Sequence, residues 1–285
     1  MKIKKIGVIG AGTMGNGIAH VFAQNNFSVE FIDINEELLQ KGLSTIEKNL
    51  ERQLKKEIIS KEVVELTLSN IIPKVGIGNL AHNVDLVIEA VIENKAVKTH
   101  IYKDLNNLLN PNCIISSNTS SISITELASY SLNPAKFIGM HFMNPVPVMR
   151  LVEIIRGYST SDETFNTIKA LSESIGKIPV EVKDYPGFIS NRILMPMINE
   201  AIFSLFENVA SAEDIDKVMK LGMAHPMGPL ELADFIGLDV CLAIMNVLYE
   251  GFNDSKYRPC PLLKNMVAAR KLGRKSGEGF YKYTK

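Results

Sequence analysis

Short apolar runs rich in β-branched residues alternate with longer amphipathic stretches over the first two thirds of the chain. Strands are predicted at residues 5–9, 29–32, 86–89, 114–116, 137–141, 151–155 and 178–182. Helices are predicted at residues 15–24, 36–56, 95–109 and 162–175. Such alternation is typical of βαβ units that build a mostly parallel sheet. The expected fold class is therefore α/β, beginning with a Rossmann-type domain.

The pattern changes after Asp184, where strand-like runs end and apolar residues recur at helical spacing. We therefore predict two domains, a nucleotide-binding sheet domain at residues 1–184 and an all-helical domain at residues 185–285. A helical insertion is expected after Asp33 in the first domain. The second is rich in methionine, which we interpret mainly as core filling, with a self-association face as the alternative.

Composition excludes several classes of partner. The chain has 285 residues, and its 31 Lys and Arg balance 31 Asp and Glu, so it lacks the basic surplus of proteins that bind nucleic acid or anionic membranes. Its three cysteines lie far apart, without zinc-ligand spacing, so we expect no disulfide framework, no metal site and a reducing, cytoplasmic setting. No apolar run approaches the roughly 18 residues of a membrane span.

A glycine-rich turn directly follows the first predicted strand and opens the first predicted helix. Its residues are Gly10, Ala11, Gly12, Thr13, Met14 and Gly15. Glycines at this spacing allow a tight turn and close approach of a dinucleotide pyrophosphate, which the helix N-terminus stabilises. Asp33 ends the next strand, where a carboxylate accepts hydrogen bonds from a ribose diol and repels a 2′-phosphate. We therefore predict NAD in preference to NADP, with a purely structural turn as the alternative.

His141 and Glu153 are the main candidates for acid–base chemistry. His141 ends a predicted strand, at the sheet edge where open α/β folds bind ligands. Glu153 stands among aliphatic residues on the next strand, where a buried charge is costly unless it is paired. A carboxylate partner would orient the imidazole and raise its basicity. An ordinary buried salt bridge is the alternative. The other four histidines lack an obvious partner and are interpreted as structural or exposed.

Five motifs, in this order, resemble the L-3-hydroxyacyl-CoA dehydrogenase family. They are the glycine-rich turn, Asp33, and residues 117–121, 141–147 and 184–192. The resemblance extends from Ile6 to Tyr281 and covers nearly the whole chain. It implies reversible hydride transfer between a nicotinamide cofactor and C3 of a short-chain 3-hydroxyacyl-CoA, such as the acetoacetyl-CoA couple. Such reactions belong to fatty-acid and butanoate metabolism.

The resemblance also implies roles for individual residues. His141 would be the general acid and base, Glu153 would stabilise its imidazolium, and Ser120 and Asn191 would hydrogen-bond the reacting oxygen. From the residues alone, Ser120 is a polar loop residue and Asn191 could cap a helix.

Further cofactor contacts are implied at Glu93, Lys98, Asn144 and Lys275, with Ser120 shared between cofactor and substrate. Without the resemblance, Glu93 and Lys98 would be solvated charges at a helix start, and Lys275 an ordinary tail lysine.

A basic stripe on the helix after Asp33 offers charge to the phosphates of CoA. Its residues are Lys48, Arg52, Lys55 and Lys56, spaced four and three apart. The alternative is a solvated face on which Glu51 pairs with Lys55. The family places its CoA contacts at Asn49 and Lys56, and Asn49 stands where serine is frequent.

Three other functions compete with this interpretation. Ser120, His141 and Glu153 could form a hydrolase triad, but the Gly-x-Ser-x-Gly nucleophile turn is missing around Ser120. A non-catalytic NAD-binding regulator would not need all four candidate catalytic residues. A dehydrogenase of a free hydroxy acid or sugar acid would not need the basic stripe. The resemblance further implies a homodimer formed through the helical domain.

Overall fold

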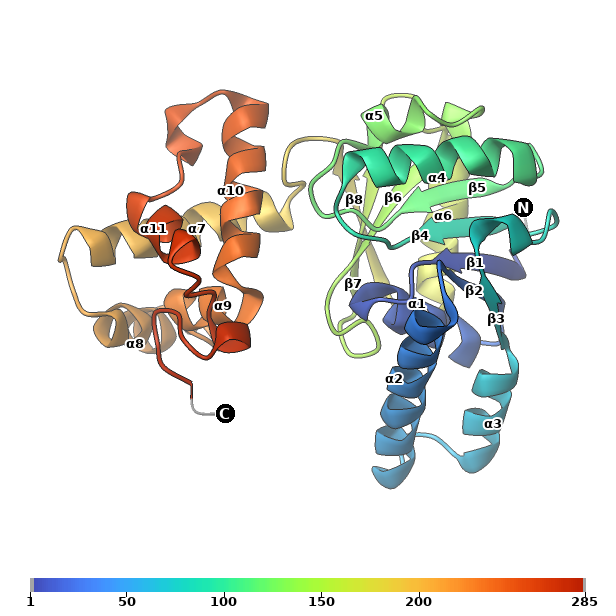
Figure 1. Ribbon diagram of the computed structural model, residues 1–285, viewed down its shortest axis with the longest axis horizontal. Helices are drawn as coiled ribbons and strands as arrows, with labels where there is room; N and C mark the ends of the chain where they lie inside the picture. Colours follow the sequence, from blue (N-terminus) through green and yellow to red (C-terminus); the bar gives the residue numbers. More distant parts are fainter. Residues whose placement is uncertain (1–2, 284–285) are drawn as a thin grey trace. The chain divides into compact units, whose positions relative to one another are not determined.

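The computed structural model describes residues 3–283, and the chain divides into two compact units. The first unit ends at Asp184 and the second begins at Tyr185. Figure 1 shows the sheet and its helices in the first unit, and helices only in the second.

The first unit is built on one eight-stranded sheet with the order β3-β2-β1-β4-β5-β6-β7-β8. Its strands are β1 (Lys5–Ile9), β2 (Ser28–Asp33), β3 (Ile71–Val75), β4 (Leu86–Glu89), β5 (Ile114–Ser117), β6 (Phe137–Phe142), β7 (Leu151–Arg156) and β8 (Ile178–Lys183). Every neighbouring pair is parallel except β6 and β7. The predicted mostly parallel α/β sheet is confirmed.

Helices cover this sheet because parallel strands must be buried on both faces. They are α1 (Thr13–Gln24), α2 (Glu36–Lys55), α3 (Lys61–Ser69), α4 (Lys95–Leu108), α5 (Ile124–Ala128) and α6 (Asp162–Ser174). Ile6 and Val8 of β1 are fully buried, as are Ile18 and Phe22 of α1. Side-chain caps fix helix starts: Asn35 accepts from the Leu38 amide at 2.9 Å.

β3, α3 and α5 are absent from the sequence prediction. β3 contains Pro73, which removes a backbone donor and weakens the strand signal, but it lies at the edge of the sheet, where proline is tolerated. The opposite edge strand, β8, also contains a proline, Pro179. Figure 1 shows α2 and α3 side by side, extending away from the sheet as the helical insertion expected after Asp33.

The second unit is helical, as predicted. Its helices are α7 (Ser190–Phe206), α8 (Ala212–Gly222), α9 (Pro229–Ile236), α10 (Leu238–Phe252) and α11 (Pro261–Ala268). Met195 and Met245 are buried in its core, whereas Met223 is 61% exposed. The interpretation of the methionines as core filling therefore holds for the first two and is wrong for Met223.

Two buried carboxylates hold the second unit together. Asp216 accepts the backbone amides of Leu230 and Glu231 at the start of α9, at 2.8 and 2.9 Å. Asp234 accepts the amides of Phe280 and Tyr281, both at 2.9 Å. The chain after α11 is thus attached to α9 by charge-assisted hydrogen bonds.

Across residues 3–283, no single helix is both long and apolar enough to cross a membrane. One pair, α9 and α10, passes the length and composition test when joined, but the two helices are bent by 99° at their junction.

Candidate active site

The glycine-rich turn runs from the end of β1 into α1. Gly10 has φ +103°, and a Cβ there would lie 2.6 Å from the carbonyl oxygen of Ala90. A Cβ on Gly15 would lie 1.7 Å from the carbonyl oxygen of Gly10. Both positions therefore require glycine, the first for its backbone conformation and the second for close packing of helix against strand.

Gly12 has a different environment, because a Cβ built there would meet no atom within 4 Å. Space therefore opens beside the N-terminus of α1. The first turn of α1 contains no acidic residue, and no side chain in the described part of the chain caps it. Helix-terminal amides and the helix dipole favour an anion at such a position. The turn fits the pyrophosphate of a dinucleotide.

Asp33, at the end of β2, is bonded to this turn. Its Oδ2 accepts the Ala11 amide at 2.5 Å, and its Oδ1 accepts the Ile34 amide at 2.7 Å. A carboxylate offers about four acceptor sites, so capacity remains for ribose hydroxyls. Asp33 can thus shape the turn and accept bonds from a bound nucleoside.

A cleft of about 330 Å³ adjoins the turn. Its lining includes Gly12, Asn49 from α2, and Asn144 from the loop after β6. The structure therefore brings together the glycine-rich turn, one predicted cofactor residue and one predicted CoA residue. Lys41 also lines the cleft, and the sequence analysis missed it. Lys56 is exposed at the C-terminal end of α2 and does not line the cleft.

His141 and Glu153 face one another across the antiparallel pair β6 and β7. The Nδ1 atom of His141 lies 2.7 Å from Oε2 of Glu153, and the two residues are only 8% and 2% exposed. The pairing expected from the sequence is therefore present. A carboxylate acceptor places the proton on Nδ1, so Nε2 is the nitrogen that can take up a further proton.

Ser120 follows β5, the strand next to β6. Because β1, β4, β5 and β6 run parallel, their carboxyl ends meet at one edge of the sheet. The side chain of Asn118 accepts the Phe142 amide at 2.9 Å, which ties the Ser120 loop to the strand that carries His141. The glycine-rich turn, the Ser120 loop and the His141–Glu153 pair thus share this edge.

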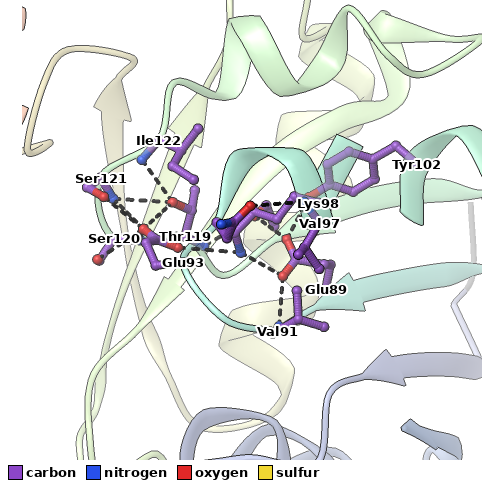
Figure 2. Close-up of polar contacts among 12 residues, drawn as sticks. Glu89, Val91, Glu93, Val97, Lys98, Tyr102, Thr119, Ser120, Ser121 and Ile122 are labelled. Atoms are coloured by element: carbon purple, nitrogen blue, oxygen red, sulfur yellow. Dashed lines mark hydrogen bonds and ion pairs between the residues drawn. The ribbon is translucent and has the colours of Figure 1, made fainter. Parts of the chain in front are cut away.

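Glu93 holds the Ser120 loop through a single carboxylate oxygen, as Figure 2 shows. Its Oε1 accepts the Thr119 hydroxyl at 2.6 Å, the Ser120 amide at 2.9 Å and the Ser121 hydroxyl at 2.8 Å. Partial burial raises the pKa of Glu93, but the Lys98 charge and these donors outweigh it and hold the pKa below its ordinary value. Glu93 is therefore an ionised acceptor at neutral pH.

Lys98 is 1% exposed, so the expectation of a solvated charge at this position is wrong. Its Nζ lies 2.7 Å from Oε1 of Glu89 and 3.4 Å from Oε2 of Glu93. An ammonium tolerates burial only when it is paired, and two carboxylates supply that pairing.

Two residues of this network escaped the sequence analysis, Glu89 and Tyr102, and Ser117 was identified only as part of the motif at residues 117–121. Burial and the neighbouring Glu89 hold the pKa of Tyr102 well above its ordinary value, so its hydroxyl remains a donor. A signal was present in the sequence, because Glu89 is an acidic residue at the carboxyl end of an apolar strand. Asp33 was identified by the same kind of position.

Asn191 and Lys275 belong to the second unit. Asn191 is 8% exposed in the first turn of α7, whose N-cap is Ile189, so the alternative that Asn191 caps the helix is wrong. Lys275 Nζ lies 2.5 Å from Oδ1 of Asp239.

Two family models cover almost the whole chain. The 3-hydroxyacyl-CoA dehydrogenase NAD binding domain matches residues 5–185, and the C-terminal domain of the same family matches residues 187–283.

Similar proteins and structures agree with this match. A probable 3-hydroxybutyryl-CoA dehydrogenase of Bacillus subtilis is 53% identical over 99% of this chain and 98% of its own length. The human mitochondrial hydroxyacyl-coenzyme A dehydrogenase is 43% identical over 99% of this chain and 91% of its own. The crystal structure of (S)-3-hydroxybutyryl-CoA dehydrogenase from Ralstonia eutropha has a TM-score of 0.97 at 51% identity, covering 100% of both chains.

The lowered pKa of Glu93 predicts a pH-dependent contribution to stability. Above its ordinary value of 4.5 the ionised group stabilises the folded state, and this is lost as the pH falls through the lower folded-state pKa. Glu93→Gln should therefore reduce the free energy of unfolding most at neutral pH and progressively less in acid. Urea denaturation of both proteins across a pH series measures the difference. An equal loss at every pH would contradict the assignment.

Proposed function

This chain belongs to the 3-hydroxyacyl-CoA dehydrogenase family, and from that premise we propose that it is an NAD-dependent 3-hydroxybutyryl-CoA dehydrogenase. The observation that carries the proposal is the His141–Glu153 pair, 2.7 Å apart, on the same sheet edge as the glycine-rich turn. Relatives named for this activity match the chain along its whole length. The substrate couple is 3-hydroxybutyryl-CoA and acetoacetyl-CoA.

His141 is the general acid and base. In oxidation its Nε2 accepts the proton of the C3 hydroxyl, and in reduction it returns that proton to the oxygen. Glu153 stabilises the imidazolium and keeps the ring oriented, because its carboxylate is buried against Nδ1. When bound, the nicotinamide accepts or supplies the hydride. Ser120 and Asn191 hydrogen-bond the reacting oxygen and position the substrate.

Residues of the first unit hold the cofactor, and the resemblance to the family adds Lys275 as a further proposed cofactor contact. The turn from Gly10 to Gly15 binds the pyrophosphate, and Asp33 binds the adenosine ribose. Glu93, Ser120 and Asn144 contact the nicotinamide half, and Lys98 acts through Glu93, to which its ammonium is bonded. The carboxylate of Asp33 favours NAD over NADP by repelling a 2′-phosphate.

The acyl-CoA phosphates bind along α2, at Asn49 and Lys56. All four residues of the basic stripe are exposed. No ion pair between Glu51 and Lys55 occurs in the described part of the chain. This supports a stripe available to a polyanion over the alternative of a self-paired solvated face.

We also propose a cytoplasmic homodimer formed through the second unit. Val209, in the loop between α7 and α8, and Val218 and Leu221, on α8, are 72%, 60% and 80% exposed, and apolar side chains grouped on a surface mark association sites. An almost apolar groove between α7 and α8 adjoins Val209 and Val218 and suits a second copy of this chain. All three cysteines are buried and free, which agrees with a reducing compartment.

The enzyme assay tests the function directly. Purified protein should oxidise NADH when given acetoacetyl-CoA, and NADPH should serve less well at equal subsaturating concentrations. His141→Gln should lower turnover about 100-fold or more with near-normal NADH binding, because only the acid–base group is lost. Turnover is followed at the nicotinamide absorbance and binding by NADH fluorescence. An inactive wild-type protein would refute the proposed substrate, and equal loss of binding and turnover would refute the role of His141.

The CoA assignment predicts a selective effect on KM. Lys56→Ala should raise KM for acetoacetyl-CoA about threefold to fivefold, the scale of one exposed ion pair, with little effect on a thioester truncated before its phosphates. Lys61→Ala is the matched control, since Lys61 is exposed at the start of α3 and pairs with Glu65. If Lys56→Ala left the ratio of the two KM values unchanged, Lys56 would be an ordinary solvated residue without a role in CoA binding.

Light scattering after size-exclusion chromatography tests the homodimer. The mass should be twice the 31.6 kDa of one chain, and Val218→Glu should shift the protein toward one chain. Lys217→Glu, on the neighbouring exposed position, should leave the mass unchanged. A wild-type mass of one chain would exclude the dimer.

A further inference from the structure

Glu89 is a fully buried carboxylate that ends β4, with an exposure of 0%. Its Oε1 accepts the Val91 amide at 2.8 Å and the Lys98 ammonium at 2.7 Å. Its Oε2 accepts the hydroxyls of Tyr102 at 2.6 Å and Ser117 at 2.7 Å. Four donors, from the loop after β4, from α4 and from β5, thus satisfy one buried charge, which would otherwise be costly.

Lys98 links Glu89 to the Ser120 loop. Figure 2 shows its ammonium between the carboxylates of Glu89 and Glu93, and Glu93 bonds residues 119–121 on its other side. Glu89 is therefore connected to Ser120 through two ionised side chains.

Glu89, Lys98 and Glu93 together carry two negative charges and one positive charge. Lys98 lies closer to Glu89, at 2.7 Å, than to Glu93, at 3.4 Å. At low local dielectric these attractions are strong. Without the charge on Glu89, the buried ammonium would move toward Oε2 of Glu93 and draw that carboxylate away from the loop donors, which bind its Oε1. Glu89 thus keeps Glu93 available to the loop.

We propose that Glu89 is a positioning residue for the Ser120 loop and acts through Lys98 and Glu93. The effect of Glu89 on catalysis rests on the proposed function, in which Ser120 contacts the reacting oxygen. The effect of Glu89 on the position of the loop does not depend on that function and can be measured without substrate. The competing interpretation is a purely structural anchor that joins β4, α4 and β5.

Hydrogen exchange of the intact protein separates these interpretations. Glu89→Gln keeps the size of the side chain and removes its charge, so the amides of Ser120 and Ser121 should exchange at least about tenfold faster. Glu30→Gln is the matched control, because Glu30 is 1% exposed and pairs with Lys5 and Lys74 but does not touch the loop. A structural anchor alone would give equal changes in the two variants.

Kinetics with acetoacetyl-CoA and NADH provide the second measurement. Glu89→Gln should lower kcat about tenfold with KM within about twofold, since a displaced positioning loop costs turnover more than binding. In a Ser120→Ala background the same substitution should have little further effect, because residues that act through one group are non-additive. An unchanged kcat, or additive losses, would overturn the proposal.

Tyr102→Phe is the second variant for the exchange measurement, to be used if Glu89→Gln does not fold. It removes one donor to Glu89 and leaves all charges in place, so loop exchange should rise in the same direction by a smaller factor. Loop amides that exchange as in the wild type would refute the coupling. A wild-type protein inactive on acetoacetyl-CoA would instead refute the proposed function, while the exchange result would still decide the role of Glu89.

Discussion

A buried carboxylate must be met by donors, and this constraint organises the active edge of the sheet. Glu153 is met by His141 at 2.7 Å, and Glu89 by four donors from α4, β5 and the loop after β4. Asp33 is half-buried and is met by the Ala11 amide of the glycine-rich turn and by the amide of Ile34. In each case one acidic side chain fixes the position of a functional segment, and for the buried Glu153 and Glu89 leaving the charge unpaired would cost several kcal/mol.

Much of the fold follows from the sequence because its main signals are local. Short apolar runs rich in β-branched residues identified seven of the eight strands within about two residues. β3 was missed because Pro73 makes its local signal weak, and only its pairing with β2 stabilises it as a strand. Tertiary pairing is not visible in a single sequence.

The site was predictable to the extent that its residues end strands or resemble known motifs. His141 and Glu153 could be paired because adjacent strands place them opposite one another. The burial of Lys98 could not be predicted, since it depends on Glu89 and Glu93 approaching the same helix from two other segments. A lysine near a helix start normally reaches water, and only the fold shows that this one does not.

The two prolines in the edge strands also disfavour pairing of those strands with the edge strands of other molecules. An open sheet ends in rows of unpaired backbone groups that can template another strand. Pro73 in β3 and Pro179 in β8 each remove one such donor, and exposed or half-exposed charges on Lys74, Glu181 and Lys183 flank them. Strand-to-strand growth into aggregates is thereby disfavoured at both edges.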